Sequence, residues 1–264
     1  MPDDPVYAHG HDDAVLRSHR RRTAADSAAH LVPHLRPGMS LLDVGCGPGT
    51  VTAGLAALVA PGRVVGIDPE PRVLDEARSL APGVDFVATD LAGFDPGGER
   101  FDVVHAHQVL HHLADPVAAL RTMAGLAVPG GLVAAREADW AAMTWWPADP
   151  RLDRWLALFR HVLPADGLDA GRRLLAWALD AGLEDVRYTT SSWTFATPED
   201  RAWWGETWAE RTTGSGFAER AVADGLATAD ELADVAAGWR AWAADPGAVF
   251  VVLHGEVIAR APAR

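Results

Sequence analysis

The chain has 264 residues, a hydrophobic fraction of 49%, a charged fraction of 22% and a formal net charge of −13 at pH 7. This composition is typical of a folded globular protein and excludes a disordered chain, and no apolar run approaches the roughly 18 residues of a membrane span. The negative charge repels phosphate backbones and disfavours a nucleic-acid partner, and the acidic amino terminus without an apolar stretch predicts a cytoplasmic protein.

The first predicted element is an amphipathic helix over residues 12–35, where apolar side chains recur mostly at three- or four-residue steps. Pro37 and Gly38 end it. Short apolar runs then alternate with helical patterns, and strands that alternate with helices predict a parallel sheet. The predicted strands are 40–44, 63–67, 84–89, 101–106 and 131–136, with helices reaching 60, 80 and 127.

The pattern changes beyond residue 137, because all eleven tryptophans lie after residue 139. We expect a single domain over 1–264, whose helical segments 138–185 and 198–245 cover the substrate. The remaining predicted elements are a helix over 171–181, a strand over 186–195, helical stretches over 198–224 and 229–244, and a last strand over 249–258.

Three glycines in five positions follow the first strand, in "LLDVGCGPGT". The absence of side chains at Gly45, Gly47 and Gly49 lets a ligand approach the backbone N–H groups of the turn closely. Such a turn at the start of a helix suits a polar or anionic ligand end. Asp68, at the tip of the second strand, is placed to accept hydrogen bonds from a ribose diol.

Two kinds of cofactor fit a glycine turn with a distant carboxylate. The dinucleotide fingerprint is G-x-G-x-x-G, whereas the third glycine comes one place early here. Asp43, two residues before the first glycine, would repel a pyrophosphate and suits a cationic amine. A ligand with a ribose, an adenine and an ammonium group but no phosphate is S-adenosylmethionine.

Five consecutive motifs carry a family resemblance: "LLDVGCGPGT", "VVGIDPEP", "VATDLAGFD", "FDVVHAHQVLHHLADP" and "PGGLVAARE". Over residues 35–137 they resemble the motifs of class I S-adenosylmethionine-dependent methyltransferases. The layout is also similar to small-molecule methyltransferases that include the quinone-ring C-methyltransferases, although the amino-terminal segment departs from the quinone enzymes. The resemblance implies an α/β, doubly wound, mostly parallel seven-stranded sheet of Rossmann-like type, with a helical lid. Its sixth and seventh strands would be 186–195 and 249–258, the last antiparallel.

The resemblance also implies a cofactor site. Asp43 and the turn would surround the methionine end, Asp68 would bind the ribose, and Asp90 with the backbone of Leu91 would bind the adenine. His107 would face the sulfonium. Tyr7 would close over the cofactor or would be an ordinary packing tyrosine, and Cys46 has the alternative role of a small filler. The full predicted cofactor set is Tyr7, Asp43, Gly45, Cys46, Gly47, Pro48, Gly49, Asp68, Pro69, Asp90, Leu91 and His107.

Methyl transfer from a sulfonium is an in-line displacement, so the enzyme must mainly align the acceptor and exclude water. A hydroxyl or amine acceptor benefits from a base, and histidine is the usual candidate. Proximity to the tip of the fourth strand favours His111 or His112 as catalytic residues, ahead of His107, His161 and Asp139, while an activated carbon acceptor needs no base. No cysteine or carboxylate at matching spacing completes a metal set, so we expect no metal.

Trp140, Trp145 and Trp146 follow the carboxyl end of the fifth strand, where open sheets bind ligands. They are predicted to line a pocket for a small apolar or aromatic substrate, with ordinary packing as the alternative. Trp177, Trp239 and Trp242 are expected in the core. Two alternatives to a methyltransferase remain, a nicotinamide-dependent oxidoreductase and a non-catalytic S-adenosylmethionine-binding protein. We expect no nucleic-acid or membrane partner, and the sequence leaves the oligomeric state and the acceptor atom open.

Overall fold

The computed structural model describes residues 21–162 and 167–263, which fall into two compact units. The core unit comprises 21–138, 170–191 and 254–263, and the helical unit comprises 139–162, 167–169 and 192–253. The predicted cofactor-binding segment 35–137 lies wholly in the core unit. Tyr7 and the first part of the helix predicted over 12–35 lie outside the described residues. The described part of that segment contains the short helix α2 (Ala24–Ser27) and the 3₁₀ turn η1 (Val32–His34).

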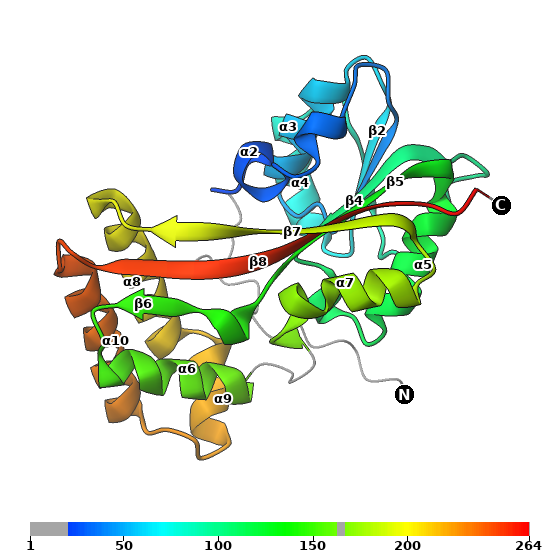
Figure 1. The fold of residues 1–264 in the computed structure, drawn as a ribbon. Helices are drawn as coiled ribbons and strands as arrows, with labels where there is room; N and C mark the ends of the chain where they lie inside the picture. The colour runs from blue at the N-terminus through cyan, green and yellow to red at the C-terminus, as the bar shows by residue number, and fades with distance from the viewer. Residues whose placement is uncertain (1–20, 163–166, 264) are drawn as a thin grey trace. The chain divides into compact units, whose positions relative to one another are not determined.

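The strands form a mostly parallel sheet (Figure 1). Five parallel strands stand in the order β3-β2-β1-β4-β5, and β8 pairs with β5 in the antiparallel sense. The predicted α/β fold with an antiparallel last strand is therefore confirmed. The bounds are β1 Leu41–Val44, β2 Val64–Asp68, β3 Asp85–Ala88, β4 Phe101–His107, β5 Ala127–Ala138 and β8 Val249–Arg260.

Two further strands complete the eight of the described residues. The strand β7 (Glu184–Phe195) corresponds to the sixth predicted strand and pairs with β8. The strand β6 (Thr144–Trp146) pairs with the first residues of β8 within the helical unit. The sequence did not predict β6, because three residues are too few to show a hydrophobic period.

The helices of the core unit begin where the sequence supplies a cap. Glu70 and Asp115 each accept a backbone hydrogen bond at a helix start, and each is followed by a proline at the first helical position. In Figure 1, α3 and α4 lie on one side of the core sheet, while α5 and α7 lie on the other. The bounds are α3 Thr50–Val59, α4 Pro71–Leu80, α5 Pro116–Leu126 and α7 Ala170–Asp180.

The two faces of the core sheet differ in character, because successive residues of a strand point to opposite faces. One face packs beneath α5 and α7 and is apolar, with Leu42, Val104, Val133 and Val257 among its buried residues. The other face carries a buried strip of polar and ionisable side chains, here called the polar strip. Its members are Asp43, His105, His107, Arg136, His254 and Glu256.

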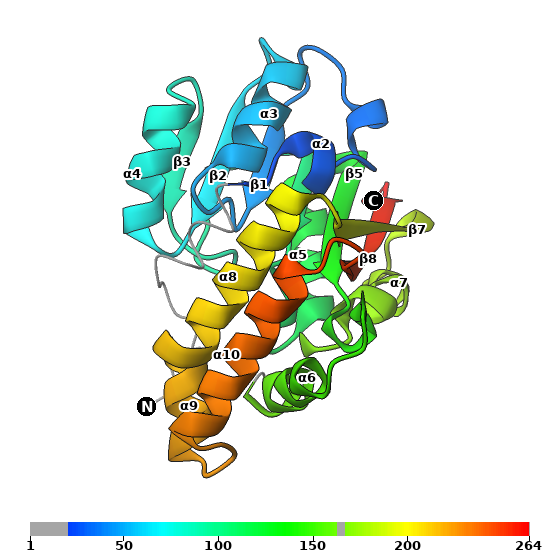
Figure 2. The ribbon, with the colours of Figure 1, turned by 90° about the vertical axis from the view of Figure 1, so that its left-hand side faces the viewer.

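The helical unit is built around tryptophan rings. The centroid of the Trp155 ring lies 4.6 Å from that of Trp208 and 4.8 Å from that of Trp239. The helices α8 and α10 run side by side (Figure 2). The predicted core positions of Trp239 and Trp242 are confirmed, as is that of Trp177 in the core unit. The bounds are α6 Pro150–Val162, α8 Pro198–Gly214, α9 Gly216–Ala223 and α10 Ala229–Ala244.

The stretch predicted as one helix over 198–224 is two helices that meet at Ser215. The backbone of Ser215 is extended, and its hydroxyl accepts a hydrogen bond from the Phe217 N–H to cap α9. No helix among the described residues is long and apolar enough to cross a membrane.

Candidate cofactor and catalytic site

The glycine turn joins the end of β1 to the start of α3. Gly47 has a φ of 52°, and a Cβ built there would meet no atom within 4 Å, so the turn is open on that side. Gly45 has a φ of 66°, and its Cβ would come within 2.4 Å of Val109 Cγ2. Gly45 therefore needs to be glycine because a side chain there would clash with Val109. At Gly47 the backbone is open to a ligand.

Asp68 ties the tip of β2 to this turn. One carboxylate oxygen accepts the N–H of Gly47 at 2.9 Å, and the other accepts the N–H of Glu70 at 3.0 Å. The side chain is half-buried beside the open edge of Gly47. A carboxylate held in this way is fixed in place and retains lone pairs for a hydroxyl donor.

Asp43 is buried beneath the turn and is bound by two side chains. Its Oδ2 accepts the hydroxyl of Thr52 at 2.6 Å, and its Oδ1 lies 2.7 Å from Nδ1 of His105. The carboxylate thus links β1, β4 and α3 from below the site.

The predicted adenosine-binding residues lie at the ends of β2 and β3. Asp90 is exposed, and its Oδ1 accepts the N–H of Gly93 at 2.7 Å. Pro69 is exposed, and Leu91 is partly buried against the apolar core. The structure therefore places Asp68, Pro69, Asp90 and Leu91 at the carboxyl ends of neighbouring parallel strands.

Cys46 and Pro48 are buried within the turn. Burial raises the pKa of the Cys46 thiol well above its usual range, and the neighbouring charges of Asp43 and Asp68 act in the same direction. The thiol is therefore protonated at neutral pH and acts as a small packed side chain.

His107 lies at the tip of β4, at the end of the polar strip. Burial lowers the pKa of its imidazole well below the usual value, and the charges of Arg136 and Arg22 lower it further. The ring stacks on that of His254 with centroids 6.3 Å apart. The imidazole at this strand tip is therefore neutral. A neutral ring is compatible with a nearby cation, whereas a protonated ring would repel it.

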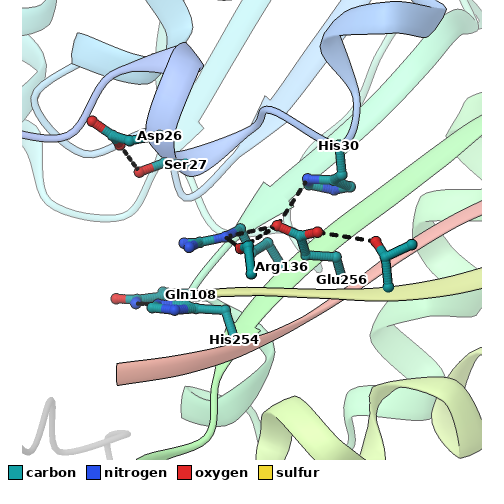
Figure 3. A network of polar contacts seen from close by, with 9 residues as sticks. Asp26, Ser27, His30, Gln108, Arg136, His254 and Glu256 are labelled. Carbon is teal, nitrogen blue, oxygen red and sulfur yellow. Dashed lines mark hydrogen bonds and ion pairs between the residues drawn. The ribbon is translucent and has the colours of Figure 1, made fainter. Parts of the chain in front are cut away.

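The polar strip continues with a buried ion pair between Arg136 and Glu256 (Figure 3). Arg136 Nε lies 3.2 Å from Glu256 Oε1, and the hydroxyls of Thr189 and Ser191 also donate to this carboxylate. Burial lowers the pKa of Arg136 to about 10, while the charge of Glu256 opposes that shift. The guanidinium is therefore charged at neutral pH.

Gln108 follows His107 and has a strained backbone. Its φ of 55° lies in the left-handed region, which side chains other than glycine rarely occupy. The nitrogen of its side-chain amide lies 2.9 Å from Nε2 of His254 and donates to it (Figure 3). Its backbone N–H donates to the backbone carbonyl of Arg136. Strain of this kind is concentrated at functional sites.

His30 packs over the polar strip, and its burial is expected to make the stability of the fold sensitive to acid. Burial lowers its pKa from 6.5 to about 3, so its 3.8 Å approach to Glu256 is no ion pair at neutral pH. The unfolded chain binds a proton here below about pH 6.5 and the folded chain only near pH 3, so stability falls between those values on acidification. We expect His30→Leu to flatten the decline in unfolding free energy, measured by urea titration at several pH values. An unchanged slope would contradict a neutral His30.

The structure adds a carboxylate that the sequence did not predict. Glu137, at the end of β5, is fully buried, and its Oε2 lies 2.6 Å from Nδ1 of His111. Its Oε1 accepts the N–H groups of Val109 and Leu110 at 2.9 and 2.7 Å. The ring of His112 contacts that of His111, with centroids 3.8 Å apart. Both histidines belong to the 3₁₀ turn η2 (Leu110–His112) that follows β4.

The tryptophans predicted to line the substrate pocket belong to the helical unit. Trp140 is buried against Phe159, and Trp145 stacks on Phe250 with centroids 5.6 Å apart. Trp146 is 63% exposed, and its carbonyl accepts the indole N–H of Trp242. Two of the three therefore take part in the aromatic packing of their own unit, and one is open to a ligand.

Sequence reasoning missed Gln108, Arg136 and Glu137 as members of this region. The signal for two of them was a pair of charged residues, Arg136 and Glu137, at the end of the otherwise apolar strand "LVAARE". Charges that end a buried strand need partners. Among the described residues, no group of three histidine, cysteine or acidic side chains could hold a metal ion.

The family model of the methyltransferase domain matches residues 16–188. An uncharacterized methyltransferase of Schizosaccharomyces pombe is 31% identical over 97% of this chain and 96% of its own length. Among solved structures, the YcgJ protein of Bacillus subtilis is similar with a TM-score of 0.56, 16% identity and coverage of 89% of this chain and 98% of that one. The [4+2]-cyclase SpnF is similar with a TM-score of 0.53, 21% identity and coverage of 97% and 87%. At these identities the two structures show the fold alone.

Proposed function

This chain belongs to the methyltransferase domain family and uses S-adenosylmethionine as its cofactor, and from that premise we propose that it methylates a small, largely apolar or aromatic molecule. The observation that carries the proposal is the open glycine turn at the end of β1, fixed to Asp68 at the tip of β2. That arrangement presents the open backbone of Gly47 and the carboxylate of Asp68 to one ligand. It fits a nucleoside that carries an amino acid.

In this proposal Asp68 accepts the ribose hydroxyls, and Asp90 with the backbone of Leu91 holds the adenine. The glycine turn and the charge of Asp43 hold the methionine end. Pro69 packs beside the adenosine, and the neutral His107 lies near the sulfonium. Cys46 and Pro48 shape the turn from within. Tyr7, outside the described residues, keeps the role of a cofactor contact that the resemblance implies.

The acceptor is proposed to be small and to have an apolar or aromatic body. Support comes from the aromatic residues that follow β5, of which Trp146 is exposed. The segments 138–185 and 198–245 are proposed to cover the substrate as parts of a single methyltransferase domain. The likeness to quinone-ring C-methyltransferases falls within this acceptor class. The net charge of −13 supports the proposal that nucleic acid is no partner.

Methyl transfer needs no covalent intermediate with the protein. The cofactor supplies an electrophilic methyl group on a positively charged sulfur. The chain must hold the acceptor in line, exclude water and remove a proton where the acceptor has one to lose. His111 and His112, on the turn that follows β4, are the proposed proton acceptors.

The test is incubation with methyl-labelled S-adenosylmethionine and a panel of small phenols, quinols, alcohols, amines and carboxylic acids. We expect label in an organic product and an equal amount of S-adenosylhomocysteine. Retention of the cofactor without turnover on any acceptor would indicate a binding protein. Binding of a nicotinamide dinucleotide in its place would contradict the assigned site.

A further inference from the structure

The strongest unassigned feature of the core unit is the buried carboxylate of Glu137. It makes three short contacts, all with the segment Val109–His111 that directly follows the tip of β4. Two of them come from backbone N–H groups and converge on Oε1. The third joins Oε2 to the imidazole of His111. The carboxylate is therefore fixed by the backbone at one oxygen while the other faces a histidine.

This arrangement selects one tautomer of His111. A carboxylate accepts hydrogen bonds only, so Nδ1 of His111 carries the proton that points at Glu137. In the neutral ring the second nitrogen, Nε2, then bears the lone pair. The side chain of His111 is 5% exposed and that of Glu137 is fully buried, so water does not compete for this contact.

The same carboxylate distinguishes the two candidate histidines. The ring of His111 is bound at Nδ1 by Glu137, whereas the ring of His112 packs against the ring of His111. A base must be held in a defined orientation to accept a proton from a bound acceptor. The contact with Glu137 supplies that orientation to His111.

We infer that Glu137 is a positioning residue that holds His111 as the proton acceptor, and that the methyl acceptor is a hydroxyl group. The inference rests on the proposed function and narrows its acceptor class. The hydroxyl oxygen forms a bond to the methyl carbon, the carbon–sulfur bond breaks, and its electron pair stays on sulfur. The hydroxyl proton passes to His111 Nε2, which later releases it to water. An activated carbon acceptor needs no base, and a neutral amine is already nucleophilic before it loses its proton, so an oriented base favours a hydroxyl.

The first test needs no acceptor. In uniformly ¹⁵N-labelled protein saturated with S-adenosylhomocysteine, nitrogen shifts at alkaline pH should show His111 with its proton on Nδ1. The signal is assigned by its loss in His111→Asn. In Glu137→Gln, the amide can still accept the backbone N–H groups but presents its NH₂ to the ring, so the proton should move to Nε2. A wild-type ring already protonated at Nε2 would overturn the inference.

The second test is kinetic and uses the phenol or alcohol of the panel that turns over fastest. Glu137→Gln and His111→Asn should each lower kcat about 100-fold, with KM and the dissociation constant for S-adenosylhomocysteine within about twofold of wild type. Glu137→Asp keeps the charge and should recover part of the loss. Glu99→Gln, an exposed carboxylate of the core unit, is the matched control. Melting temperatures of all variants exclude misfolding as the cause.

The outcomes separate the two proposals. Turnover confined to carbon or amine acceptors, or a larger loss of kcat in His112→Asn than in His111→Asn, would overturn this inference and leave methyl transfer intact. Loss of S-adenosylhomocysteine affinity in Glu137→Gln at unchanged melting temperature would also overturn it. Failure of the wild-type protein to bind S-adenosylhomocysteine would overturn the proposed function itself.

Discussion

Replacing Glu256 with alanine is expected to lower the free energy of unfolding by about 3–5 kcal/mol, the usual cost of breaking a buried ion pair from one side. Arg136 is fully buried, and the substitution removes the carboxylate that lies 3.2 Å from its Nε. The hydroxyls of Thr189 and Ser191 lose the same acceptor. In a protein of this size the melting temperature should fall on the order of 10 °C, measured by calorimetry beside urea unfolding.

The control is a surface ion pair of the same unit. Glu99 pairs with Arg63, and their side chains are 60% and 50% exposed, so Glu99→Ala should cost less than about 1 kcal/mol. Replacing both Arg136 and Glu256 with methionine should recover most of the loss, because no buried charge then lacks its partner. An equal decrease in the free energy of unfolding for Glu256→Ala and Glu99→Ala would show that the buried pair does not stabilise the fold.

The sequence predicted the fold well where local signals mark both the period and the ends of an element. The strands before Glu137 are short apolar runs, and the helices between them begin at caps such as Glu70-Pro71 and Asp115-Pro116. A break inside a longer helical pattern is harder to see. Gly214 and Gly216 flank Ser215, which separates α8 from α9. Single glycines are tolerated inside helical patterns, so the sequence predicted one helix where the structure has two.

The sequence placed the glycine turn and Asp68 at neighbouring strand tips, because the strands β1 and β2 follow one another and pair. It did not predict the polar strip. A buried strand shows little alternation, so nothing in "VVHAH" indicates that His105 and His107 share a face with Arg136. The partner of Arg136, Glu256, is 120 positions away. Pairing over such a distance is set by tertiary structure.

The candidate site shows the same division between local and distant contacts. The turn was predicted from its own residues, whereas Glu137 was missed because its contact with His111 joins two strand ends. Asp43 was expected to face a ligand ammonium. In the structure its two oxygens contact Thr52 and His105, and the sequence did not predict these contacts because they depend on the packing of α3 and β4 against β1.

Replacing Asp68 with alanine is expected to weaken the binding of S-adenosylhomocysteine about 10- to 100-fold, the equivalent of one hydrogen bond to a charged group. The proposed ribose contact is lost, and the N–H of Gly47 loses its acceptor at the turn. Isothermal calorimetry measures the affinity. Asp68→Asn keeps one acceptor oxygen without the charge, so its affinity should lie between those of the wild type and Asp68→Ala. Asp95→Ala is the matched control, because this exposed carboxylate also accepts a backbone N–H two residues on. If Asp68→Ala bound as tightly as Asp95→Ala, the ribose would have to be held elsewhere, and the glycine turn would lose its assigned partner.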